Sequence, residues 1–460
     1  MGIPNRVTLS SALGLVMGGS VLLSAGSAAA PPGVQPEKPK DHWAIVQCGT
    51  LLAVPGQAPL RNATVIAKNG RITSVTNGIV DRAAVSREAS PDAEVVVVDL
   101  RDRYVLPGLI DCHVHLTMET SADQRLRYVS ESDADRALNG VVYARRTLEA
   151  GFTTVRDVGS PGEVGVALRD AINEGKVPGP RMFVSAMSIT PTGGHADRTH
   201  GFREELFAVP GPVQGAADGV DACRQAVRAQ VKRGADLIKL TATGGVLSNT
   251  AAGLEQQFFE DELKAIVDTA HLLKKKVAAH AHGTNGIKAA IKAGVDSIEH
   301  GTYIDEEAIS LFKQYGTYYV PTITAGKSVS EYAAFPNYYT APVVVKALAV
   351  GPQIQETFGK AYRAGVKIAF GTDAGVFPHG DNSREFIYMV EAGMPAGEAI
   401  RSATITASEL IGNNAEVGTI EVGKYADLIG VAADPTADIS ELKRVLFVMK
   451  DGRVHKNTKP

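Results

Sequence analysis

Cysteine is scarce in this sequence. Cys48, Cys112 and Cys223 are the only three among 460 residues, and their spacing fits neither a zinc finger nor a framework of paired cysteines. The chain can therefore form at most one disulfide and requires none. Cys112 lies in the segment DCHVH, where alternation along a strand would turn its side chain away from the two histidines. We expect Cys112 to pack in the interior rather than to react.

An excess of charge is also lacking. The net charge is −3 and the basic residues are scattered, so the sequence has no electrostatic footprint for nucleic acid or an anionic membrane. No GxGxxG, P-loop or GxSxG element stands in the context that nucleotide binding or serine catalysis needs. These absences favour chemistry on a small molecule.

The N-terminal apolar stretch is too short to span a bilayer comfortably. It follows Arg6 and precedes three alanines that end at Ala30, a pattern typical of signal-peptidase cleavage. We predict a signal peptide over residues 1–30, a disordered Pro-rich leader over 31–40, and a periplasmic or secreted mature protein. An uncleaved membrane anchor is the alternative.

The two ends of the remaining chain share one pattern. Residues 41–105 and 417–460 contain short alternating segments separated by turns, such as ATVIAKNGRITSV near the start and LKRVLFVMKDGRV near the end. We predict that both ends together form one small β-sandwich domain.

Between these ends, residues 106–416 alternate apolar runs with segments of helical period, which is typical of parallel βα units. Helices are expected in DADRALNGVVYARRTLEAG, EDELKAIVDTAHLLKKK, GIKAAIKAGV and DEEAISLFKQYG. The eight predicted strands are VLPGLIDCHVHL, TTVRDVG, RMFVSAM, DLIKLTAT, KVAAHAHG, SIEHGT, TYYVPTI and KIAFGTD. They predict an α/β fold, a (β/α)8 TIM barrel whose active site lies where the strands end.

Five of these strands end in residues that bind metals or move protons: His113 and His115, Lys239, His280, His300 and Asp373. A single buried histidine is usually a satisfied core residue, but that explanation would have to hold independently at each strand. His113 and His115 are two apart on a strand, so both imidazoles point to one face and can bind one cation. Imidazole and carboxylate are good ligands for zinc and similar metals.

His282 leaves one ligand assignment open. It lies two residues after His280 on the same predicted face, so either histidine could bind a metal. We place His282 one position nearer to solvent, where it contacts substrate or forms hydrogen bonds in the wall of the site.

The segments PGLIDCHVHL, IKLTATGG, AAHAHG, SIEHGT and FGTDAG resemble the motifs of the amidohydrolase superfamily, in particular its imidazolonepropionase-like and Xaa-Pro dipeptidase-like members. The resemblance covers nearly the whole chain after residue 40. It implies two divalent metal ions, which we expect to be zinc. The implied ligands are His113, His115 and Asp373 for one ion, His280 and His300 for the other, and Lys239 for both.

Lys239 is implied to bridge the two ions as a carboxylated lysine. A free ammonium would be repelled by dications and cannot coordinate them. Reaction with carbon dioxide would convert the side chain into a bidentate anion.

Two loop residues are expected to set specificity. His195, in TPTGGHADRTHG after the third strand, and Tyr303, after the sixth, resemble residues of dipeptidase-like relatives. There, such residues hold the scissile carbonyl and the substrate carboxylate, respectively. An ordinary loop histidine or tyrosine is the alternative for each.

The resemblance implies hydrolysis of the C-terminal amide bond of a small N-acyl amino acid or dipeptide, with ochratoxin A as one specific candidate. Asp373 would bind metal, accept a proton from a metal-activated water and deliver it to the departing nitrogen. Hydrolysis of a cyclic amide is the first alternative, and a degenerate non-catalytic barrel is the second. A homo-oligomer is also expected.

Overall fold

A computed structural model describes residues 40–249 and 253–459. The predicted signal peptide and nearly all of the predicted leader lie outside these residues, so both stay predictions. Within the described ranges, no helix combines the length and hydropathy of a membrane span.

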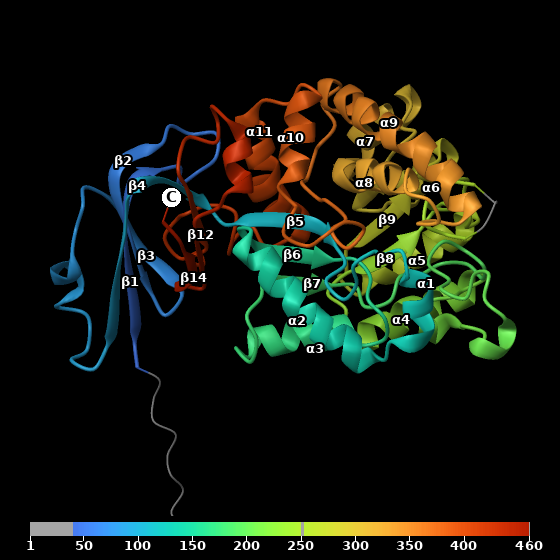
Figure 1. Ribbon diagram of the computed structural model, residues 1–460, viewed down its shortest axis with the longest axis horizontal. Coiled ribbons are helices and arrows are strands. Elements are labelled where there is room, and N and C mark those ends of the chain that lie inside the picture. The colour runs from blue at the N-terminus through green and yellow to red at the C-terminus, as the bar shows by residue number, and fades with distance from the viewer. Residues whose placement is uncertain (1–39, 250–252, 460) are drawn as a thin grey trace, which may run out of the picture. The chain divides into compact units, whose positions relative to one another are not determined.

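The two ends of the described chain build one sheet (Figure 1), in the order β14-β13-β12-β4-β1-β2-β3. β1 pairs with β4 in parallel, and the other neighbours are antiparallel. The strands are β1 (His42–Leu51), β2 (Leu60–Lys68), β3 (Arg71–Asn77), β4 (Glu94–Pro107), β12 (Leu428–Val431), β13 (Phe447–Lys450) and β14 (Arg453–Asn457). Both ends associate as predicted, but their described residues form a single seven-stranded sheet. The predicted β sandwich is therefore not confirmed.

Burial on both faces explains the apolar character of β1. Ala44, Val46 and Cys48 pack in one apolar cluster, whereas Trp43 and Ile45 pack in another on the opposite face. Contacts do not divide residues 41–460 into further units, so the predicted limits of the β domain and the barrel stay predictions.

Two parallel sheets make up the centre of the chain. β5 (Leu109–Val114), β6 (Phe152–Asp157) and β7 (Arg181–Val184) form a three-stranded sheet. The four-stranded sheet has the order β11-β10-β9-β8. Its strands are β8 (Ile238–Thr241), β9 (Val277–Ala281), β10 (Ser297–His300) and β11 (Tyr318–Val320). Seven of the eight predicted strands are thus confirmed, and each is shorter than its sequence pattern.

Single parallel bridges link these two sheets. Ile189, beyond β7, pairs with Leu240 of β8, and the backbone N–H of Ile189 donates to Lys239 at 2.8 Å. This pairing continues the parallel order from the first sheet to the second.

The eighth predicted strand, KIAFGTD, lies between β11 and β5 but forms only isolated bridges. Ile368 pairs with Tyr319 and Ala374 pairs with Val114, in both cases in parallel. The backbone N–H of Asp373 donates to the carbonyl of His113 at 2.7 Å. The fold is thus a TIM-barrel-like α/β fold, although the described strands do not form one continuous closed ladder.

Helices connect the parallel strands, and Figure 1 shows α2 and α3 beside β6 and β7. The four helices expected from sequence are confirmed as α2, α5, α6 and α7. Ser132 begins α2 with a capping box, since its side chain accepts from the N–H of Asp135 while Asp135 accepts from Ser132. The helices are α1 (Gln124–Ser130), α2 (Asp133–Glu149), α3 (Val164–Asn173), α4 (Val220–Lys232), α5 (Glu260–Leu272), α6 (Thr284–Ala293), α7 (Glu306–Tyr315), α8 (Ile323–Ala333), α9 (Ala341–Arg363), α10 (Arg384–Glu391), α11 (Ala396–Arg401) and α12 (Ala407–Ile411).

Strand alternation in β5 places side chains as expected. Val114 packs in the main core with Ala144 and Leu148 of α2, opposite to its histidine neighbours. Cys112 is buried beside Ala407 of α12, and all three cysteines are free thiols. The packing role predicted for Cys112 is confirmed.

Candidate metal centre and active site

A cavity of about 430 Å³ collects nearly all the predicted site residues, a volume typical of small-molecule sites. Its lining includes His113, His115, Lys239, His280, His300, Asp373, His195 and His282. Tyr303 does not line this cavity. The residues come from the carboxyl ends of β5, β8, β9 and β10 and from the segments that follow them, as a barrel site requires.

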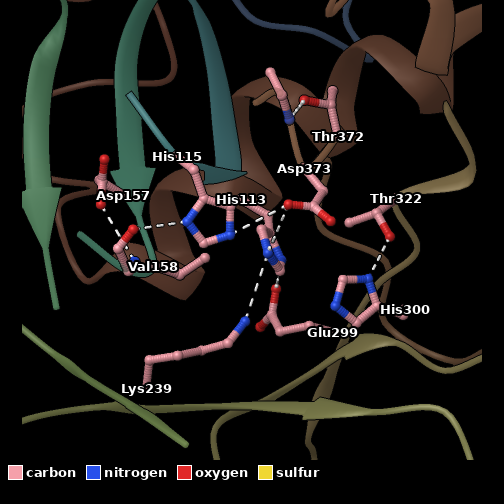
Figure 2. A network of polar contacts seen from close by, with 12 residues as sticks. His113, His115, Asp157, Val158, Lys239, Glu299, His300, Thr322, Thr372 and Asp373 are labelled. Atoms are coloured by element: carbon pink, nitrogen blue, oxygen red, sulfur yellow. Dashed lines mark hydrogen bonds and ion pairs between the residues drawn. The ribbon is translucent and has the colours of Figure 1, made fainter. Parts of the chain in front are cut away.

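The first group of candidate ligands is His113, His115 and Asp373 (Figure 2), whose ligand atoms lie within 4.8 Å of one another. Nε2 of His113 and Nε2 of His115 lie 3.5 and 3.3 Å from the same atom, Oδ1 of Asp373. Their Nδ1 atoms are held elsewhere, at 2.7 Å from Glu299 and 2.8 Å from the carbonyl of Gly159. Such contacts on the second nitrogen orient a metal-binding imidazole and leave Nε2 to bind.

His280, His282 and His300 form the second group, again within 4.8 Å. Nδ1 of His282 contacts Thr302 and Nδ1 of His300 contacts Thr322, each at 2.8 Å. In His280 the other ring nitrogen is engaged, since Nε2 lies 3.2 Å from the carbonyl of Gly244. Each imidazole therefore keeps one nitrogen available as a ligand.

His282 is not nearer to solvent than His280, contrary to the sequence-based expectation. Their exposed fractions are 4% and 5%. The stacking of the His282 ring on His300, with centroids 4.9 Å apart, keeps it inside the site. The structure brings both histidines to the same group and leaves both as candidate ligands.

Lys239 lies between the two groups. Its Nζ is 3.5 Å from Nε2 of His113. Burial is the main cause that lowers the pKa of His113 in the first group and of His300 in the second, and the charge of Lys239 lowers both further. Burial lowers the pKa of Lys239 itself to about 8, which increases the fraction of neutral amine. A neutral amine is the form that can react with carbon dioxide.

The residues fit a divalent cation on two grounds. Oδ1 of Asp373 is buried without a hydrogen-bond partner among the described residues. Burial of an unpaired carboxylate oxygen raises the free energy of the folded state unless a cation binds it. Burial also lowers the pKa of His113 to about 4 and of His282 to about 3, and lowers those of His280 and His300. Neutral imidazole is the form that binds metal.

Left-handed backbone at strand ends turns two of these ligands inward. His300 has φ 70° and Asp373 has φ 62°, and Thr322, which contacts His300, has φ 51°. Such conformations are rare outside glycine and cluster at functional sites. At β10 the turn matters directly, because regular alternation would put Glu299 and His300 on opposite faces.

Glu299 and Arg156 are candidate positioning residues that the sequence interpretation missed. Glu299 is buried, accepts from Nη2 of Arg156 at 2.8 Å and holds Nδ1 of His113. Burial alone would raise the pKa of Glu299, but Arg156 and His113 lower it to about 2. The signal was present in the charged pair of TTVRDVG and in the two-residue spacing of Ser297 and Glu299.

The loop after β7 brings His195 to the second group. Its ring stacks on His280 with centroids 4.2 Å apart, and its Nδ1 is 3.0 Å from Ser248. Gly245 permits this approach, since a Cβ there would lie 2.2 Å from the His195 ring. His195 is therefore placed to contact a bound substrate, whereas the cavity gives no support to the role predicted for Tyr303.

Comparisons with known proteins identify relatives of this chain. The model of the amidohydrolase family matches residues 104–455. Ochratoxinase of Aspergillus niger is 34% identical over 443 residues, which cover 90% of this chain and 86% of the relative. Imidazolonepropionase of Rhizorhabdus wittichii is 27% identical over 84% of this chain and 92% of its own length.

Solved structures show the same fold. The crystal structure of a Xaa-Pro dipeptidase with methionine bound in its active site is 44% identical, with a TM-score of 0.85 over 90% of this chain and 100% of that chain. The crystal structure of the Aspergillus niger ochratoxinase has a TM-score of 0.77 at 31% identity, over 91% of this chain and 96% of that chain.

Glu299→Gln tests how the first group is held. The amide cannot balance Arg156 and no longer fixes His113 as a charged acceptor, so metal affinity should fall about 10- to 100-fold. Chelator competition measures the affinity. Glu306→Gln, at the exposed start of α7, is the control and should change nothing. An unaltered affinity in Glu299→Gln would show that Glu299 does not position His113.

Proposed function

Because this chain belongs to the amidohydrolase family and is a hydrolase acting on amide bonds, we propose that it cleaves the C-terminal amide of small N-acyl amino acids or dipeptides. The observation that carries the proposal is the pair of ligand groups with Lys239 between them, in the wall of one cavity. A degenerate barrel would be free to lose such residues, and here all of them converge.

Two divalent ions, for which we propose zinc, would be held by these groups. His113, His115 and Asp373 would hold one, and His300 with His280 or His282 the other. We propose that Lys239 is carboxylated and joins both. When bound, such ions lower the pKa of water and polarise a carbonyl oxygen.

Asp373 is the group that moves the proton. Burial would raise its pKa, but His113, His115 and Lys239 outweigh this and lower it, so the carboxylate is ionised and can accept a proton. Oδ1 of Asp373 lies 3.5 and 3.3 Å from Nε2 of His113 and Nε2 of His115, so this oxygen would face the ion that the two histidines hold. The proton taken up by the carboxylate would pass to the departing nitrogen.

His195 is placed to orient the substrate carbonyl. Burial lowers the pKa of His195 to about 3, so the ring is neutral and has one N–H donor. This donor is Nε2–H, free for a substrate, in the tautomer whose Nδ1 accepts from the hydroxyl of Ser248. The relatives support the substrate class, because one is named for ochratoxin and another for Xaa-Pro dipeptides. Ochratoxin A is therefore one candidate substrate. The likeness to imidazolonepropionase keeps a cyclic amide as the alternative.

A substrate screen tests the proposal. Dipeptides and N-acyl amino acids with varied C-terminal residues, together with ochratoxin A and a set of cyclic amides, are offered to enzyme supplied with zinc. We expect release of the C-terminal amino acid from at least one set. Cleavage of cyclic amides with no release from any linear substrate would contradict the proposal and favour the alternative.

Asp373→Asn should separate proton transfer from metal binding. The amide keeps one oxygen but loses its basicity, so kcat should fall at least about 10²- to 10⁴-fold. Much of the metal should remain, since the other ligands are untouched. Metal content and kcat are measured on one preparation, with the exposed Asp381→Asn as control. Near-normal turnover with both ions present would assign the proton to another group, with His282 next.

A further inference from the structure

Lys346 of α9 holds the turn that follows β8. The residue is only 7% exposed, and its Nζ donates to the carbonyl oxygens of Gly245 and Ser248 at 2.9 and 2.7 Å. The hydroxyl of Thr340, which precedes α9, donates to the side chain of Asn249 at 2.7 Å. The start of α9 is therefore fixed to this turn at more than one point.

The same turn holds the ring of His195. The hydroxyl of Ser248 lies 3.0 Å from Nδ1 of His195, and it also lies 2.8 Å from the carbonyl oxygen of Gly245. A hydroxyl has a single proton, so at any moment it donates to only one of these two acceptors. The acceptor that takes this proton decides the tautomer of His195.

The two arrangements present opposite chemistry to a substrate. If the hydroxyl donates to Gly245, Nδ1 of His195 carries the ring proton and donates to Ser248. Nε2 then offers only a lone pair, which repels a carbonyl oxygen. If the hydroxyl donates to Nδ1 instead, Nε2 carries the proton and can donate to that oxygen. Only the second tautomer can fulfil the role proposed for His195.

The buried carbonyl of Gly245 is the acceptor that competes with His195 for the hydroxyl proton. Turning the hydroxyl toward His195 would take a donor away from this carbonyl, and a lost hydrogen bond in the interior is unfavourable. Nζ of Lys346 already donates to the same oxygen, and a hydrogen bond from a charged donor is stronger than one from a hydroxyl. Lys346 therefore reduces the cost of the second arrangement.

We propose that Lys346 is a positioning residue that sets the tautomer of His195. By satisfying the carbonyl of Gly245, it allows Ser248 to donate to Nδ1 and so keeps the ring proton on Nε2. The inference rests on the proposed function, because it takes His195 as the donor to the substrate carbonyl. Lys346 acts through the turn and does not itself contact the reacting atoms.

The tautomer is measured by ¹⁵N NMR of the zinc-loaded enzyme labelled with ¹⁵N-histidine, since protonated and unprotonated ring nitrogens resonate far apart. His195→Gln identifies the signals of His195. We expect the proton on Nε2 in the wild type and on Nδ1 in Lys346→Met. A proton on Nδ1 in the wild type, which is a result independent of how well Lys346→Met folds, would overturn the proposal. An unchanged tautomer in Lys346→Met would do the same.

Turnover of N-benzoyl-L-phenylalanine, followed through the release of benzoate, tests the consequence. A hydrogen bond to the carbonyl oxygen strengthens as negative charge develops there, so loss of its donor affects kcat more than KM. In Lys346→Met, kcat should fall about 10- to 100-fold while KM stays within about twofold of the wild type. Lys346→Arg keeps N–H donors and should recover part of kcat. An unchanged kcat in Lys346→Met, or a loss confined to KM, would contradict the assignment.

The Ser248→Ala background separates positioning from a direct effect of charge or of stability. Alanine cannot donate to His195, so adding Lys346→Met to Ser248→Ala should lower kcat little further. An effect of the lysine charge on the cavity, or a general loosening of α9, would persist in this background and overturn the proposal. Lys360→Met is the control, because it removes an exposed lysine of the same helix that pairs with Glu356. It should change neither kcat nor the tautomer.

The NMR measurement also separates this inference from the proposed function, because it needs no turnover. A proton on Nε2 in the wild type that moves to Nδ1 in Lys346→Met supports the role of Lys346 even if no linear amide is cleaved. Hydrolysis of N-benzoyl-L-phenylalanine by a wild type whose ring proton lies on Nδ1 would reject the role of Lys346 and keep the function.

Discussion

The ion pair between Arg156 and Glu299 is the contact on which the metal-binding geometry depends. Its side chains are only 3% and 0% exposed, and Arg156 also donates to the carbonyl of Cys112 at 2.5 Å. One arginine thus ties β6 to β5 and to β10, and fixes the carboxylate that orients His113. Removing one partner of such a buried pair typically costs about 3–5 kcal/mol, because the other charge is left unpaired. The position of Nε2 of His113, beside Asp373 and Lys239, follows from that contact.

Backbone conformation at the strand ends supplies what alternation cannot. Three residues with positive φ, His300, Thr322 and Asp373, stand at or just beyond strand positions and turn polar groups toward the cavity. The cost of each conformation is about 1–3 kcal/mol, which the surrounding hydrogen bonds must offset. Those bonds are visible at His300 and at Asp373, where side-chain and backbone partners lie within 2.8 Å. These hydrogen bonds thus stabilise strained backbone that directs the candidate ligands toward one another.

Most strands of the fold and most residues of the candidate site could be predicted from the sequence. The features that could not be predicted have physical causes. Period-2 spacing placed His113 with His115, and motifs at strand ends identified Lys239, His280, His300 and Asp373, which the structure brings together. The eighth strand was predicted where only bridges form, because periodicity does not report pairing. Glu299 was not predicted, because regular alternation puts only one of Glu299 and His300 on the inward face. Both face the site because His300 has a positive φ, which the sequence does not reveal. Tyr303 lies in a turn, where no periodicity predicts the direction of a side chain.

Metal content per chain, measured by elemental analysis on the wild type and on Lys239→Ala, tests whether Lys239 joins the two halves of a two-ion centre. We expect two divalent ions per wild-type chain. In Lys239→Ala we expect loss of metal together with activity, with partial recovery on adding a short carboxylic acid. Two retained ions and full activity in Lys239→Ala without any additive would contradict this role of Lys239.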